Sequence, residues 1–178
     1  MSDVTLTIAL SRELAPILVS VVNSGRVGSA IAAELGSMKV TEQIDALESF
    51  AVDPTRYLVV PRVLACLMMV PLLSGLGLLI GIIGGWVVAT QMMGISSTLF
   101  LDSIQAFLSP ADVFKGMFKS AIFGLVVAVI GCHMGLTAKK GAQGVGAATT
   151  NSVVYSMITI FILNYILSMA LFPAGGMN

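Results

Sequence analysis

The feature that most constrains this chain is a run of 39 residues, Val63 to Leu101, that contains no charged side chain. Eight of the chain's eighteen charged residues lie just before it, between Glu34 and Arg62. A soluble domain cannot hide so long an uncharged stretch, because its surface needs polar groups. A membrane-spanning helix needs only about 20 apolar residues to cross the hydrocarbon. The run therefore predicts a membrane protein with one charged aqueous segment.

Composition supports an all-α integral membrane protein. Hydrophobic residues make up 57% of the chain and charged residues 10%, and the mean hydropathy is +0.99. The 178 residues leave room for a single transmembrane domain, 1–178, and none for a separate soluble module, so any source of chemical energy has to be another polypeptide. The net charge is zero and no run of Lys or Arg is longer than the pair Lys139 and Lys140, so the sequence lacks the basic patch that nucleic-acid binding requires.

The hydropathy pattern divides the chain into four spans and two connecting segments. We expect transmembrane helices at about 14–33, 63–93, 120–138 and 153–172, a cytoplasmic segment at 34–62 and an outer-side segment at 94–119. The positive-inside rule favours a cytoplasmic position for the 34–62 segment and for the pair Lys139 and Lys140. The outer-side segment should form a helix along the membrane interface, because its apolar residues have helical spacing.

The first span carries two polar residues, Asn23 and Arg26. A charged side chain is costly inside a bilayer, so Arg26 should lie at an interface, face a wet cavity or meet a carboxylate. Small residues recur every fourth position along the same helix and should allow close packing against another helix; they are Ser24, Gly28, Ala32 and Gly36.

The 34–62 segment has the pattern of a short amphipathic helix. Thr41 can act as its N-cap, and Ile44, Leu47 and Ala51 share one face. The opposite face is acidic and consists of Glu42, Asp45 and Glu48. Asp53 and Pro54 then begin a second helix through Tyr57 and Leu58. This pattern is typical either of a helix lying on the membrane or of a docking surface for a soluble partner.

In the strongest span, 63–93, Pro71 predicts a kink and three glycines form two consecutive GxxxG spacings. These glycines, Gly77, Gly81 and Gly85, indicate a close helix contact. Cys66 and Cys132 lie in apolar runs without metal-type spacing and are expected to be core residues.

We expect no metal site and no cofactor. His133 is the only histidine and has no second ligand candidate nearby, so a structural role is favoured. The glycines at 141, 144 and 146 follow no strand and precede no GK[ST] sequence, which argues against a phosphate-binding loop.

Residues 11–62, SRELAPILVSVVNSGRVGSAIAAELGSMKVTEQIDALESFAVDPTRYLVVPR, resemble the signature region of the MlaE permease family, the membrane subunits of lipid-transporting ABC systems. The stretch GAQGVGAATTNSVV at 141–154 is similar to a second recurrent region of that family. The resemblance implies a bacterial inner-membrane permease that dimerises and moves phospholipid or another hydrophobic molecule between membranes. The partners it implies are two cytoplasmic ABC ATPase subunits and a substrate-binding protein of the Mce type.

In this reading the chain itself is not an enzyme, since ATP hydrolysis belongs to the partner. The resemblance identifies the helix at 41–48 as the coupling helix that contacts the ATPase, through Thr41, Glu42, Gln43, Asp45 and Glu48. Four charges near the membrane are further candidates for functional residues; they are Arg12, Glu13, Arg26 and Glu34.

Members of the family usually have an interfacial helix and one more span before the RELxP stretch, whereas only ten residues precede Ser11 here. A missing N-terminal part keeps a second hypothesis open, a membrane scaffold or assembly subunit that transports nothing. A third hypothesis, an intramembrane enzyme, would need a buried nucleophile with a base or paired acids. The sequence shows no such arrangement.

Overall fold

The computed structural model describes residues 14–92, 94, 96–107 and 110–171. These residues form helices and connecting turns and contain no strand. Four helices are long and apolar enough to cross a membrane, Ala15–Val40, Thr55–Gln91, Pro110–Leu136 and Ala142–Leu171. The predicted all-α integral membrane fold with four spans is thereby confirmed.

The first span is one continuous helix in three parts, α2 (Ala15–Asn23), the π-helical segment η2 (Ser24–Gly28) and α3 (Ser29–Val40). It continues seven residues past the expected end at 33, because Leu35 and Gly36 are buried against the bundle and hold the last turns in place. Glu34 therefore lies on the spanning helix rather than in a separate aqueous segment.

The expected amphipathic helix is present as α4 (Gln43–Ser49), but its cap differs from the prediction. Glu42 is the N-cap and has a left-handed backbone, φ 60°. The Thr41 hydroxyl donates instead to the Ser37 carbonyl (2.9 Å), so Thr41 ends α3 and the expectation that it caps α4 is wrong. Ala51 follows the helix with φ 59° and is exposed, so it does not share the face of Ile44.

The predicted second short helix is the beginning of the second span. The Asp53 carboxylate accepts a hydrogen bond from the Thr55 amide (2.9 Å), as expected of an N-cap. The π-helical segment η3 (Thr55–Val59) then continues without a break into α5 (Val60–Gln91), which contains Pro71 in its interior. The spanning helix thus begins eight residues before the predicted boundary at 63.

The remaining helices also extend beyond the predicted spans. The outer segment contains α6 (Ser97–Phe107), but α7 (Pro110–Leu136) already includes residues 110–119. Lys119 on α7 is fully buried, and its Nζ donates to Ser168 Oγ (2.7 Å), which explains how a charged residue is accommodated inside a long helix. The glycine-rich stretch after Gly141 forms the first turns of α8 (Ala142–Leu171).

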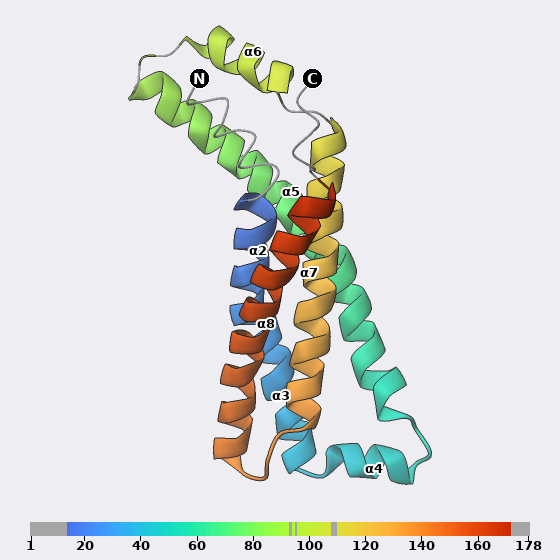
Figure 1. Cartoon of the computed structure of the whole chain (residues 1–178). Helices are drawn as coiled ribbons and strands as arrows, with labels where there is room; N and C mark the ends of the chain where they lie inside the picture. Colours follow the sequence, from blue (N-terminus) through green and yellow to red (C-terminus); the bar gives the residue numbers. More distant parts are fainter. Residues whose placement is uncertain (1–13, 93, 95, 108–109, 172–178) are drawn as a thin grey trace.

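Figure 1 shows α7 beside α2, α3 and α8, while α5 crosses the bundle at a slant. The helix α4 and the turn between α7 and α8 lie at one end of the bundle, and α6 lies at the other. The main core cluster joins α3, α4, α5 and α7 and includes Leu35, Ile44, Cys66, Val70 and Cys132. A second cluster joins α7 and α8 through Phe123, Val127 and Ile160.

Small residues allow the helices to approach closely. Gly28 contacts Val127 of α7, and its carbonyl accepts a hydrogen bond from Ser152 of α8 (3.2 Å). Two α7 glycines outside the predicted packing stripes make close approaches to other helices. A Cβ added at Gly124 would lie 2.8 Å from the Cys66 carbonyl oxygen, and one at Gly135 would lie 2.7 Å from the Leu35 Cβ.

Candidate functional site

The charged end of the bundle is held together by two ion pairs. Lys39 Nζ lies 2.8 Å from Asp45 Oδ1 and joins α3 to α4. Arg62 Nη2 lies 2.9 Å from Glu34 Oε1 and joins α5 to α3. The Lys39–Asp45 pair and the buried Ile44 side chain hold α4 on the bundle, and the Arg62–Glu34 pair links the two spanning helices that flank α4 in the sequence. A force applied to α4 would therefore reach α3 and α5.

The outward face of α4 is polar and exposed. It presents all five predicted coupling residues, Thr41, Glu42, Gln43, Asp45 and Glu48. The Gln43 amide donates to the Thr41 hydroxyl (3.0 Å), which orders the start of this face. We call these five residues, together with the exposed aromatic residues Phe50 and Tyr57 that follow α4 in the chain, the α4 surface.

The two aromatic residues of the α4 surface were missed by the sequence analysis. Phe50 is 77% exposed and Tyr57 is 64% exposed, although both lie in the charged part of the chain. Exposed aromatic side chains beside charged ones are typical of protein interfaces. One sign of an exposed aromatic residue is present in the sequence, because Phe50 lies outside the apolar face of Ile44 and Leu47 that anchors α4.

A polar groove lies beside the α4 surface. It has a volume of about 430 Å³, and its lining includes Lys39, Glu42 and Asp45 on one side and Lys139 and Lys140 on the other. Lys139 and Lys140 therefore lie at the same end of the bundle as α4. This arrangement is expected if the two segments face the same aqueous compartment.

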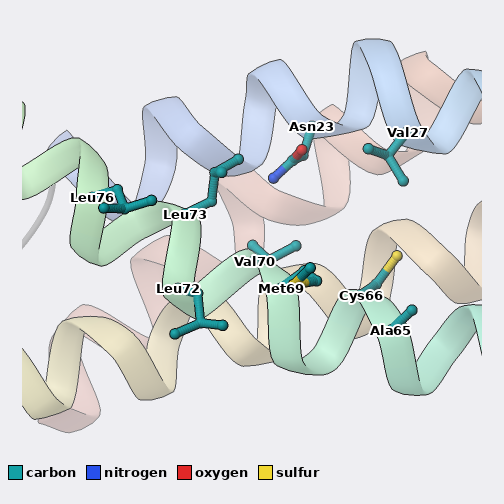
Figure 2. Close-up of a pocket in the computed structure, with 9 residues that line it drawn as sticks. All are labelled: Asn23, Val27, Ala65, Cys66, Met69, Val70, Leu72, Leu73 and Leu76. Atoms are coloured by element: carbon teal, nitrogen blue, oxygen red, sulfur yellow. The ribbon is translucent and has the colours of Figure 1, made fainter.

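An apolar groove of about 500 Å³ lies along the side of the bundle between the first span and α5. Figure 2 shows its lining, with the Asn23 amide directed from α2 towards α5. The α5 side of the groove is formed by aliphatic and methionine side chains with Cys66, and Val27 completes the side of the first span. A cavity with this lining suits a hydrocarbon chain.

The other predicted residues are dispersed. Arg12 and Glu13 lie outside the described residues. Arg26 is exposed in η2, halfway along the first span. On α5, Gly77 faces Val19 of α2 and Gly85 faces Phe100 of α6, so this stripe contacts two elements. Gly81, between them, is half-buried.

In the part of the chain that the structure describes, no three His, Cys, Asp or Glu side chains lie close enough to hold a metal ion. His133 is exposed on the surface of α7.

A sequence model of the family described as Permease MlaE matches residues 2–170. The chain belongs to the MlaE permease family. A relative from Synechocystis, named a probable ABC transporter permease, is 52% identical over 96% of this chain and 65% of its own length. A probable ABC transporter permease of Rickettsia prowazekii is 44% identical over 90% of this chain and 62% of its own length.

A similar plant protein is the chloroplastic protein TRIGALACTOSYLDIACYLGLYCEROL 1 of Arabidopsis thaliana. It is 42% identical to this MlaE-family chain, over 96% of this chain and 49% of its own length. The chain thus spans a little less than two thirds of the bacterial relatives and about half of the plant one.

Proposed function

We propose that this protein is the permease subunit of an ABC transporter that moves phospholipid or a similar hydrophobic molecule between membranes. Its membership of the MlaE family and its relatives named as probable ABC transporter permeases support a transport role. The Arabidopsis relative is named for a diacylglycerol lipid, which supports a lipid substrate. The apolar groove between the first span and α5 has the lining that acyl chains require.

The observation that carries the proposal is the α4 surface. Its acidic and aromatic side chains are exposed, while Ile44 and the Lys39–Asp45 pair hold the helix on the spans. An ABC ATPase docked there would act on α3 and α5 at once. Nucleotide-driven movement of the ATPase would then shift packed helices relative to one another.

The proposal also names where the protein works and with which partners. The protein acts in the bacterial inner membrane as a homodimer, with two ATPase subunits on its cytoplasmic side and an Mce-type protein supplying or receiving the lipid. The chain contributes no catalytic step, because nucleotide hydrolysis takes place on the ATPase. The aqueous end with α4, Lys139 and Lys140 faces the cytoplasm in this arrangement.

Charge reversal on α4 tests the proposal. The double variant Glu42→Lys and Glu48→Lys leaves the Lys39–Asp45 pair intact and should reduce co-purification with the co-expressed cognate ATPase at least tenfold. The matched control is Asp102→Lys, which reverses an exposed acid on α6 at the opposite end of the bundle and should have no effect.

Undiminished co-purification of the double variant would contradict the docking role of α4. That result would favour the alternative hypothesis, a non-transporting membrane scaffold, because a scaffold tolerates these substitutions.

A further inference from the structure

Arg26 lies near the middle of the membrane. It precedes Glu34 by eight residues on one continuous helix, which is about 12 Å along the axis. The Glu34–Arg62 pair marks the level at which paired charges begin, and a hydrocarbon core is about 30 Å thick. Arg26 is therefore close to half the depth of the hydrocarbon.

The packing of neighbouring helices gives the same depth. Gly28, two residues from Arg26, contacts Val127 and lies against Gly131 of α7. Both α7 residues belong to the uncharged stretch 120–138 and lie near its centre. Ser152 of α8 bonds to the Gly28 carbonyl at the same level.

Arg26 is exposed on the surface of the first span. Three ion pairs of the described residues lie at the α4 end of the bundle, Lys39–Asp45, Arg56–Asp53 and Glu34–Arg62, and none of them includes Arg26. The exposed residues above and below it on the helix, Val22 and Ala30, are apolar. A guanidinium at this depth requires an anionic or strongly polar partner.

Arg26 also lies at the edge of the apolar groove. Asn23 and Val27, which line the groove, are three residues before and one residue after it. On a helix, residues three apart are neighbours, so the Arg26 side chain begins beside the Asn23 amide that Figure 2 shows directed into the groove. The charged residue Arg26, the Asn23 amide and the apolar groove are thus adjacent.

We propose that Arg26 binds the phosphate of an anionic phospholipid inside the membrane while an acyl chain of that lipid occupies the groove between the first span and α5. A guanidinium matches a phosphate with two parallel hydrogen bonds, and the groove matches the hydrocarbon chain. The inference depends on the proposed function in one respect, namely that the ligand is a lipid. It names an anionic phosphate as the feature that is recognised.

Lipid retention by the purified chain tests this directly. The protein is equilibrated in detergent micelles that contain equal amounts of phosphatidylglycerol and a neutral galactolipid with the same acyl chains, and the lipids that remain bound are quantified by mass spectrometry. The wild type should retain phosphatidylglycerol preferentially. Arg26→Gln should reduce that preference about tenfold, the factor expected for one charge-assisted hydrogen bond.

Three further variants make the result specific. Arg26→Lys keeps the charge but cannot make the two parallel hydrogen bonds, so its preference should lie between those of the wild type and Arg26→Gln. Ala30→Glu places a carboxylate one turn from Arg26 and should abolish the preference even if Arg26→Gln fails to fold. The matched control is Arg56→Gln, which removes an exposed charge outside the spans and should change nothing.

The inference is overturned if Arg26→Gln and Ala30→Glu retain the wild-type preference for phosphatidylglycerol. It is also overturned if Arg26→Gln converts an oligomer to monomers while lipid retention stays unchanged, because Arg26 would then contact a second copy of the chain. Displacement of the bound lipid by millimolar inorganic phosphate would overturn it as well, in favour of a site for the free anion. The assay needs no ATPase, so its outcome is independent of the docking test on α4.

Discussion

At the scale of single residues, the closest helix contacts depend on glycines of α7. A Cβ at Gly124 would lie 2.8 Å from the Cys66 carbonyl oxygen and 2.9 Å from the Val70 Cβ, and neither atom belongs to a side-chain tip that could move aside. Gly124→Ala should therefore destabilise the protein by about 1–3 kcal/mol, the usual cost of overpacking. Thermal unfolding in detergent measures this loss.

The matched control is Gly84→Ala on α5, because no atom lies within 4 Å of a Cβ added there. Its unfolding temperature should equal or slightly exceed that of the wild type, since alanine favours helix more than glycine does. Equal destabilisation by both substitutions would show that α5 and α7 are not in backbone contact at Gly124.

The sequence could indicate that small residues matter but not which helices they join. The spacing of Gly77, Gly81 and Gly85 is regular, yet the structure places Gly77 against Val19 and Gly85 against Phe100 rather than against one helix backbone. Gly124 and Gly135 make the tight contacts, and small residues also recur every fourth position before them on α7. Periodicity identifies a face of a helix, whereas the partner of that face depends on tertiary packing.

At the scale of elements, α4 is held by its apolar face. Ile44 is 3% exposed and belongs to the main core cluster with Leu58 and Cys66. Ile44→Ala should remove about 2–5 kcal/mol of packing free energy and let α4 detach locally. Hydrogen exchange of the α4 amides should then accelerate while exchange in α7 stays unchanged.

Phe50→Ala is the control at this scale, because Phe50 follows α4 but is 77% exposed. It should leave amide exchange in α4 at the wild-type rate. Slow exchange in the Ile44→Ala variant would mean that the Lys39–Asp45 pair holds α4 in place without the Ile44 contact.

The boundaries of the elements were harder to predict than their existence. Uncharged stretches identify the part of a helix that can lie in hydrocarbon, but Thr55–Gln91 begins with charged and polar residues and is still one helix. Neither the Glu34–Arg62 pair nor the burial of Lys119 against Ser168 can be read from hydropathy. In both cases contacts between distant parts of the chain extend a helix past the apolar window.

At the scale of the whole molecule, the fold fixes which segments share a side of the membrane. The four spans place α4 and the turn with Lys139 and Lys140 at one end and α6 at the other. The class and the number of spans were predictable, because they follow from uncharged length alone. The orientation of the bundle rests on the basic residues near α4.

Cysteine labelling in spheroplasts tests this orientation. Thr98→Cys on α6 should react with a membrane-impermeant maleimide added outside, whereas Ser49→Cys and Lys140→Cys should react only after the membrane is permeabilised. All three positions are exposed in the structure, and the native Cys66 and Cys132 are buried, so the unsubstituted protein is a control with low background. Outside labelling of both Ser49→Cys and Lys140→Cys would invert the bundle and place α4 beyond the reach of a cytoplasmic ATPase. Labelling of these two positions from opposite sides would contradict the fold, because the two spans between them, Thr55–Gln91 and Pro110–Leu136, return the chain to the side on which it started.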